Sequence, residues 1–325
     1  MSNRRPQTRY IDVFNGDADG LCALRQLRLA EPAESQLVTG VKRDIALLER
    51  VDAGEGDLVT VLDVSLDRNR AALLETLARG ARVRYFDHHH AGTVPSHAGL
   101  EAVIDTSSGT CTSLLVDRYL KGRFRVWAVV AAFGDNVGEA ACRLGGSLGL
   151  GPAQLEELCG LGECLNYNAY GESESDLLIA PAALYRLLAK YEDPFRFIAA
   201  EDVYARLSAR RREDLDAALA VAPCRLGEFA AAYVLPSAPS SRRAIGDFAN
   251  RLASLHRHRA HAVLAPRTRG GYIASVRAPA EAPSGADAFC RQFPSGGGRR
   301  EAAGIDALPE ERLGEFLERF AAAFG

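Results

Sequence analysis

Acidic and histidine side chains stand at the ends of strand-like segments in the N-terminal part of the chain. In an open parallel sheet, ligands gather outside the carboxyl ends of the strands, so side chains from several strands can converge there. The side chains concerned are Asp17, Asp19, Asp63, Asp87, His88, His89 and His90, with Asn15 just before the first of them, and Asp135 is a further candidate at the end of an apolar helix-like segment. Several carboxylates at one sheet edge repel one another unless a cation neutralises them. Carboxylates with imidazoles suit divalent manganese or magnesium better than zinc or iron, so the pattern predicts a divalent metal centre.

Each of these residues has an ordinary explanation when it is taken by itself. Asp19 and Gly20 form a common turn dipeptide, Asp135 could cap a helix, and a single histidine is most often solvated. Asp17 and Asp19 are two residues apart, so they could share a face or reach two neighbouring ions. Two ions about 3.5–4 Å apart, bridged by a shared carboxylate, clamp the attacking and leaving oxygens in phosphoryl hydrolysis. The combination is therefore far more specific than any one residue.

The segments that must position these side chains alternate between strand-like and helix-like patterns. Short apolar runs at 10–14, 37–41, 58–64 and 82–86 are separated by helical patterns, which predicts βαβ units around a parallel sheet. From about residue 111 to 230 the pattern is mostly helical, and strand–helix alternation then resumes. We expect an α/β protein with an N-terminal parallel-sheet metal-binding domain, a helical connection and a smaller C-terminal α/β substrate domain, with a cleft between the domains.

The expected domain boundary separates residues 1–225 from residues 226–325. The chain of 325 residues is long enough for two such domains, and its net charge of −3 gives no general attraction to long nucleic acid. No apolar run is long enough to span a membrane, and the N-terminal MSNRRPQTRY lacks the apolar segment of a secretory signal. Seven cysteines without a Cys-x-x-Cys pair favour reduced thiols, so we predict a cytoplasmic protein.

Five sequence motifs, in the expected order, resemble those of the DHH phosphoesterase superfamily. FNGDADG, LDVS, FDHHHAG and AFGDN are similar to the four motifs of the DHH domain. The C-terminal GGGRREAAG (296–304) resembles the GGGHxxAAG signature of the DHH-associated domain. The resemblance extends over the whole chain and implies a two-domain, metal-dependent enzyme that grips substrate phosphates with its C-terminal domain.

The resemblance also implies a role for each acidic residue in the metal centre. Asp17 and Asp19 would each bind one of two ions, with Asp63 as the bridge between them. His88 and Asp135 would complete the second site. The expected ion is Mn²⁺, with Mg²⁺ or Co²⁺ as alternatives, and a water activated by the metal would attack phosphorus.

Four residues near these ligands have weaker or indirect roles in this scheme. Asp87 would orient His88, as carboxylates do for metal-bound imidazoles, and His89 would face the substrate phosphate. His90 is an extra histidine for which solvent exposure is the plain interpretation. Asn15 stands where relatives often have an acidic residue or place a histidine nearby, so the first ion would be held weakly or completed by water.

The predicted substrate-binding residues are glycines and arginines near the C-terminus. Backbone N–H groups of a glycine-rich loop can bind an anion, and neighbouring arginines add charge. The set is Arg277, Gly296, Gly297, Gly298, Arg299 and Arg300. Arg299 replaces the signature's histidine, which puts the choice of substrate in question. Arg242 and Arg243 are weaker candidates, because a surface arginine pair is usually just solvated.

The predicted function is hydrolysis of phosphate esters in nucleotides or short oligonucleotides. A linear dinucleotide, a very short RNA and a nucleoside 3′,5′-bisphosphate are the candidate substrates, and long duplex DNA and membranes are not expected partners. Two alternatives stay open: a catalytically weak nucleotide-binding regulator, and a single-strand exonuclease of the RecJ type. A homodimer is also an open prediction.

Overall fold

The chain folds into two compact units, and the computed structural model describes residues 8–325. Residues 1–7, the start of the segment in which no secretory signal was expected, lie outside the described range. The first unit contains the chain up to Ala169 together with Leu178–Ser208, and the second contains Tyr170–Leu177 together with Ala209–Gly325. This division by packing places residues 209–225 in the second unit. The domain boundary at 225/226 stays a prediction.

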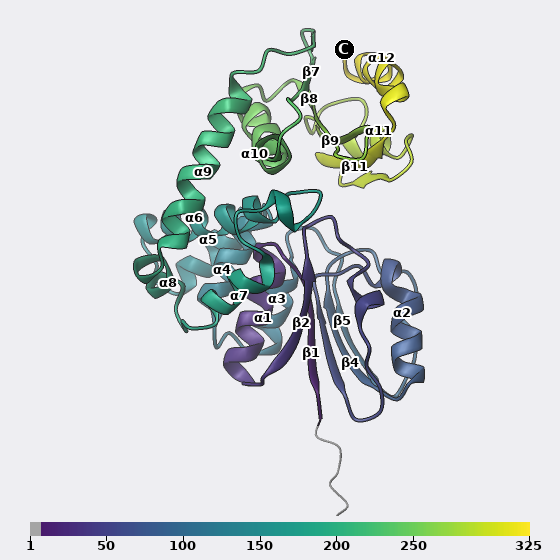
Figure 1. Ribbon diagram of the computed structural model, residues 1–325. Coiled ribbons are helices and arrows are strands. Elements are labelled where there is room, and N and C mark those ends of the chain that lie inside the picture. The colour runs from purple at the N-terminus through teal and green to yellow at the C-terminus, as the bar shows by residue number, and fades with distance from the viewer. Residues whose placement is uncertain (1–7) are drawn as a thin grey trace, which may run out of the picture. The chain divides into compact units, whose positions relative to one another are not determined.

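A five-stranded parallel sheet forms the centre of the first unit (Figure 1). Its strand order is β2-β1-β3-β4-β5, and every neighbouring pair is parallel. The chain turns to opposite sides of β1 to form β2 and β3, so the topological switch point lies beside β1. The strands are β1 (Tyr10–Asn15), β2 (Ser35–Gly40), β3 (Leu58–Leu62), β4 (Arg82–Asp87) and β5 (Leu100–Ile104).

Side-chain alternation along the strands builds a hydrophobic layer on each face of this sheet. Ile11 and Val13 point to one face, where they join the cluster that includes side chains of α2 (Leu66–Ala78). Phe14 points to the other face and packs with α1 (Ala18–Ala30) and the helices that follow. Helices therefore cover both faces, as the predicted parallel sheet requires.

The helical part of the first unit packs against α1. Trp127 is fully buried in α4 and donates its indole N–H to the Glu192 carbonyl at 2.7 Å. Gly134 and Gly162 lie where α4 and α6 approach each other so closely that a side chain at either position would meet backbone atoms. The helices are α3 (Thr112–Tyr119), α4 (Arg125–Gly134), α5 (Gly138–Ser147), α6 (Pro152–Ala169), α7 (Pro181–Leu188), α8 (Pro194–Ala200) and α9 (Asp202–Leu219), the last of which continues into the second unit.

A six-stranded sheet of order β10-β11-β9-β8-β7-β6 forms the second unit. Helix α10 (Pro239–Leu255) covers one face, while α11 (Ala286–Cys290) and α12 (Leu313–Phe324) cover the other with a cluster of phenylalanines. The strands are β6 (Arg225–Leu226), β7 (Ala230–Val234), β8 (Ala260–Pro266), β9 (Tyr272–Arg277), β10 (Gly296–Gly298) and β11 (Ala302–Leu308). The predicted α/β class is confirmed for both units.

Arg242 and Arg243 are not the solvated pair that the sequence suggested. Both are buried in α10, and Arg242 makes two hydrogen bonds, of 2.8 and 2.6 Å, to the carboxylate of Asp176. Arg243 pairs with Asp214 at 2.7 Å. These arginines therefore join separate segments of the second unit, because a buried guanidinium must be paired with carboxylates.

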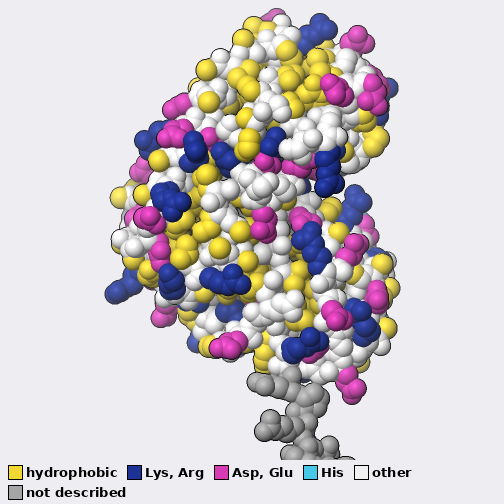
Figure 2. Space-filling view, viewed as in Figure 1, with side chains coloured by type: hydrophobic (Ala, Val, Ile, Leu, Met, Phe, Trp, Pro, Cys, Tyr) yellow, Lys and Arg dark blue, Asp and Glu magenta, His cyan; other side chains and the backbone are white. Residues whose placement is uncertain are grey.

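The face seen in Figure 2 has no wide surface of one charge. On the face seen in Figure 2, basic and acidic side chains are interspersed and form no continuous basic stripe. Within residues 8–325, no helix is both long and apolar enough to cross a membrane.

Candidate functional site

The ends of β1, β3 and β4 bring the first three motifs to one edge of the parallel sheet. Phe14, Leu62 and Phe86 are register partners, so the residues that follow them lie side by side. Asp63 and Asp87 occupy these following positions, and Asp17 comes slightly later, where α1 begins. The predicted convergence of strand ends is thus present in the structure.

His88 Nε2 is the point at which three carboxylates meet. It lies 3.4 Å from Asp63 Oδ1, 3.8 Å from Asp135 Oδ2 and 4.0 Å from Asp19 Oδ2. Ligand atoms that share one divalent ion at about 2.1 Å are about 3–4 Å apart. Only 5% of the His88 side chain is exposed. This spacing of one imidazole and three carboxylates fits a divalent cation.

Asp19 is fixed by the N-terminus of α3. Its two carboxylate oxygens accept the backbone N–H groups of Thr112 and Ser113, each at 2.7 Å. The first N–H groups of a helix have no partner within the helix and carry partial positive charge, so they suit a carboxylate. The Thr112 hydroxyl also donates to Asp63 Oδ1 at 3.2 Å. Thr112 was not among the predicted site residues, although it directly follows the small polar loop SSGTC (107–111).

Asp63 adopts a backbone conformation that is rare for residues other than glycine. Its φ is 58°, and its N–H continues the sheet by donating to the Phe86 carbonyl at 3.0 Å. Asn136, directly after Asp135, also has a positive φ of 59°. Such conformations cost free energy and occur most often at functional sites, where the surrounding structure enforces them. One of the two residues here, Asp63, is itself a carboxylate of the cluster, and the other directly follows Asp135.

The buried carboxylates have too little positive charge around them. Burial and the charge of Asp63 raise the pKa of Asp19 well above its usual range. Burial and the charge of Asp17 raise the pKa of Asp63 in the same way. A divalent cation would remove this repulsion, so the donor set fits a metal ion electrostatically as well as by distance.

Asp87 holds His89 in the structure, whereas the sequence predicted that it would orient His88. Its Oδ1 accepts a hydrogen bond of 2.7 Å from His89 Nδ1, and its Oδ2 accepts the N–H of Leu66 at the start of α2. Burial lowers the pKa of His89, but the Asp87 hydrogen bond and nearby carboxylate charges outweigh it and raise the pKa to about 9. His89 is 44% exposed and His90 is also exposed, so these two rings face solvent.

Asp17 faces Lys42, which was not among the predicted site residues. Asp17 Oδ1 caps α1 by accepting the N–H groups of Asp19 and Gly20, and Asp17 Oδ2 pairs with the Nζ of Lys42. Burial raises the pKa of Asp17, but the Lys42 charge and hydrogen bond hold it below its usual value. Lys42 follows β2, so the rule that selects residues at strand ends could have found it.

Asn15 contacts Lys42 and the first turn of α1. Its Nδ2 donates to the Lys42 carbonyl at 3.3 Å, and its Oδ1 accepts the N–H of Asp17 at 3.3 Å. The Asn15 side chain, a possible site residue in the sequence, therefore supports the backbone around Asp17.

The predicted substrate-binding residues lie together in the second unit. Arg277, at the end of β9, pairs in register with Ala302, which follows the glycine hairpin. Its guanidinium donates to Asn250 Oδ1 at 2.8 Å and to Ser275 Oγ at 3.0 Å, and burial lowers its pKa. Gly296, Gly297 and Gly298 form β10.

The two hairpin arginines differ in how they are held. Arg299 and Arg300 are both exposed, in the turn between β10 and β11. The Arg299 N–H donates to the Ala302 carbonyl at 2.8 Å, which closes this turn. Arg300 donates from its guanidinium to the Ala282 carbonyl at 3.0 Å. The Arg300 side chain is thus directed to a neighbouring loop of its own unit.

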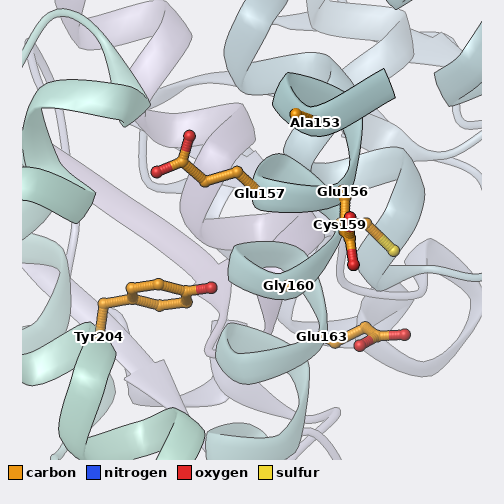
Figure 3. A pocket seen from close by; sticks show the side chains of 7 residues that line it. All are labelled: Ala153, Glu156, Glu157, Cys159, Gly160, Glu163 and Tyr204. Carbon is orange, nitrogen blue, oxygen red and sulfur yellow. The ribbon is translucent and has the colours of Figure 1, made fainter. Parts of the chain in front are cut away.

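A separate cavity of about 490 Å³ lies on α6 and is lined by none of the predicted site residues (Figure 3). Glu156, Glu157 and Glu163 of α6 surround it together with Tyr204 of α9. It is acidic, so it does not suit a phosphate ester.

Comparisons with known proteins identify relatives of the fold. No protein family model matches the chain, and no curated protein is similar to it in sequence. The crystal structure of the exonuclease RecJ bound to manganese matches with a TM-score of 0.62 and 20% identity, over 98% of this chain and 91% of that one. RecJ from Thermus thermophilus in complex with Mn²⁺ gives the same score and identity, but the match covers 52% of that longer chain.

A third solved structure of the same fold is PggH of Vibrio cholerae, a pGpG-specific phosphodiesterase. The TM-score is 0.54 at 14% identity, and the match covers 97% of this chain and all of PggH. At these identities the likeness shows the fold. This fold has the two-domain α/β class that the sequence predicts.

Proposed function

We propose that the protein is a divalent-metal-dependent phosphoesterase of the DHH superfamily that hydrolyses phosphate esters of nucleotides or short oligonucleotides. The observation that supports this most directly is the convergence of Asp19, Asp63 and Asp135 within 4.0 Å of His88 Nε2. The motif order, the fold shared with manganese-bound RecJ and the fold shared with a pGpG phosphodiesterase agree with it.

A divalent ion bound by these residues supplies Lewis-acid stabilisation of phosphoryl charge and lowers the pKa of water. We take Mn²⁺ as the ion, with Mg²⁺ or Co²⁺ as alternatives, because carboxylate and imidazole donors suit these metals. Asp63 is the central ligand, since its backbone conformation and its hydrogen bond from Thr112 both fix its carboxylate.

His89 is the residue that we assign to the substrate phosphate. Its ring is partly exposed, lies beside His88 and is held by Asp87, so an imidazole whose pKa is raised by the Asp87 hydrogen bond faces solvent at the edge of the carboxylate cluster. A positioned cation stabilises the negative charge that develops on phosphoryl oxygens. Asp87 acts in this scheme by fixing the orientation and charge of His89.

The glycine hairpin and Arg277 are the proposed phosphate-binding elements of the second unit. Arg277 is oriented by Asn250 and Ser275 rather than by a carboxylate, so its charge is available to an anion. Exposed Arg299 provides a second cation in place of the histidine of the family signature. These assignments favour a nucleotide that has more than one phosphate group.

A cytoplasmic location is part of the proposal. The seven cysteines of the chain all lie within residues 8–325 and form no disulfide there, which fits a reducing compartment. The predicted homodimer stays a prediction.

The test is hydrolysis of a substrate panel with Mn²⁺, comparing the protein with Asp63→Ala. The panel contains a linear dinucleotide, a five-nucleotide RNA, adenosine 3′,5′-bisphosphate, a cyclic dinucleotide, polyphosphate and a longer single strand. We expect turnover of a short substrate that disappears in Asp63→Ala and persists in Asp67→Ala, an exposed aspartate on α2.

Two other outcomes would redirect the assignment. Fastest cleavage of the longer single strand would favour the RecJ-type exonuclease, which the fold match makes the second candidate. No turnover of any substrate, with metal and nucleotide still bound, would favour the nucleotide-binding regulator.

A further inference from the structure

Lys42 places an ammonium group inside the carboxylate cluster. Its Nζ pairs with Asp17 Oδ2, donates to Asn166 Oδ1 at 3.0 Å and lies 4.0 Å from Asp135 Oδ1. The side chain is only 25% exposed, so the charge is largely enclosed by these partners. A lysine is seldom buried unless its charge is paired, and here the partners include two carboxylates of the predicted metal centre.

The backbone of Lys42 is held in place from two sides. Its N–H donates to the carbonyl of Ala169 at 2.9 Å, and its carbonyl accepts from Asn15 Nδ2 at 3.3 Å. Asn166 and Ala169 both belong to the last turn of α6, so the same turn fixes the Lys42 backbone and its ammonium group. Because both the backbone and the Nζ of Lys42 are held by hydrogen bonds, the fold fixes the position of the ammonium group.

Asp17 uses both of its oxygens for contacts within the protein. One oxygen caps α1 through the N–H groups of Asp19 and Gly20, and the other pairs with Lys42. Within residues 8–325, two side-chain groups have the spacing of a metal site: Asp19 with His88 and Asp135, and Asp63 with His88 and His89. Neither group includes Asp17, and both include His88.

We propose that Lys42 takes the place of one of two ions, so that the centre binds a single divalent cation through Asp19, Asp63, His88 and Asp135. This inference rests on the proposed metal-dependent function, and it replaces with one ion the two ions that the motif resemblance implies. A second divalent ion at Asp17 would have to displace the ammonium group or lie beside it, and like charges at such distances repel strongly. The carboxylates of the centre carry a total charge of −4 when all four are ionised. One divalent ion would contribute a charge of +2 and Lys42 a charge of +1. The four are Asp17, Asp19, Asp63 and Asp135.

Lys42 also has a distinct part in the chemistry under this arrangement. An ammonium group can donate hydrogen bonds to a phosphoryl oxygen and offset developing negative charge, as a second ion would. It has no open coordination position for water, so activation of the nucleophile would fall to the single ion.

The test is the Mn²⁺ stoichiometry of the purified full chain, measured by elemental analysis after equilibrium dialysis and by electron paramagnetic resonance. We expect one ion per chain in the wild type, with the spectrum of an isolated Mn²⁺ ion. Lys42→Met removes the ammonium group from Asp17 Oδ2, so this variant should bind two ions and give the spectrum of a spin-coupled pair. Lys42→Arg keeps the charge and should bind one.

Lys190→Met is the matched control, because Lys190 forms an exposed pair with Glu201, 3.0 Å away, and should leave the count at one. Two ions in the wild type would overturn the role of Lys42 and leave the phosphoesterase proposal intact. One ion in a folded Lys42→Met would also overturn it. No bound ion and no hydrolysis in the wild type would overturn the proposed function itself.

Discussion

The backbone N–H of Thr112 donates a hydrogen bond of 2.7 Å to Asp19 Oδ2, which joins the first motif to the start of α3. The same residue's hydroxyl donates to Asp63 Oδ1 at 3.2 Å. One threonine therefore orients two carboxylates from different segments, Asp19 in the first turn of α1 and Asp63 after β3. Groups that orient metal ligands commonly change metal affinity about 10–100-fold when they are removed.

Thr112→Val should weaken Mn²⁺ binding about 10–100-fold with little loss of structure. Valine keeps the shape of the side chain and the backbone N–H to Asp19, so only the hydroxyl bond to Asp63 is lost. Isothermal titration with Mn²⁺ measures the change. Thr76→Val is the control, because the Thr76 hydroxyl is used only locally, on the Ala72 carbonyl of α2. Equal affinities for Thr112→Val and wild type would show that this bond does not orient Asp63.

Asp87→Asn should lower kcat about 10–100-fold while the metal content stays unchanged. Asp87 contacts His89 and the Leu66 N–H and not the point at which the carboxylates converge, so its loss should remove the charge support of His89 and leave the metal ligands in place. The pKa of His89 should fall below its value of about 9, which nitrogen NMR of the metal-free protein can follow. Asp105→Asn, on an exposed loop, is the control. Loss of metal in Asp87→Asn would place Asp87 among the residues that act on the ion.

Arg242→Met should destabilise the second unit by about 3–5 kcal/mol, because it leaves the buried carboxylate of Asp176 without its partner. The side chains of Arg242 and Asp176 are only 4% and 5% exposed. Urea unfolding measures the change in free energy. Arg210→Met breaks an exposed pair with Glu213 and should cost about 0–1 kcal/mol. A similar small cost for Arg242→Met would mean that Asp176 finds another partner or becomes protonated.

His261 should make the second unit sensitive to acid. The ring is fully buried in β8, and neither ring nitrogen has a hydrogen-bond partner among the described residues. Burial, with the nearby His256, lowers the pKa of His261 to about 4. In the unfolded chain the pKa of His261 is about 6.5, so the unfolded state binds the proton more readily than the folded state. The contribution of this ring to the free energy of unfolding is therefore present above pH 6.5 and is lost as the pH falls toward 4.

Between about pH 7 and pH 5 this single group should remove roughly 2 kcal/mol of unfolding free energy. His261→Leu should abolish that part of the pH dependence, and His258→Leu, at an exposed position in the same unit, should retain it. Urea unfolding at the two pH values provides the measurement. If His261→Leu kept the pH dependence of the wild type, burial of a neutral His261 ring would not be the cause of that dependence.

Local sequence patterns were enough to predict the α/β class and the gathering of Asp63, Asp87 and His88 at one sheet edge. These predictions depend on two local properties, the hydrophobic period of each segment and the residue that follows each strand. Parallel strands place their carboxyl ends at one edge, so residues at strand ends meet even though they are far apart in the chain. Asp135, directly after α4, was found by its position after an apolar helical segment and by its motif.

The neighbour that each of these side chains contacts could be learned only from the folded chain. Asp87 is bonded to His89, Asp17 to Lys42, and Arg242 to a buried carboxylate. Such pairings depend on packing between segments that are distant in sequence, and a change of side-chain direction over a few ångströms selects a different partner. Local sequence pattern therefore predicts which residues lie in the cluster. The ion pairs within the cluster depend on the tertiary structure, because each buried charge must be compensated by a neighbour.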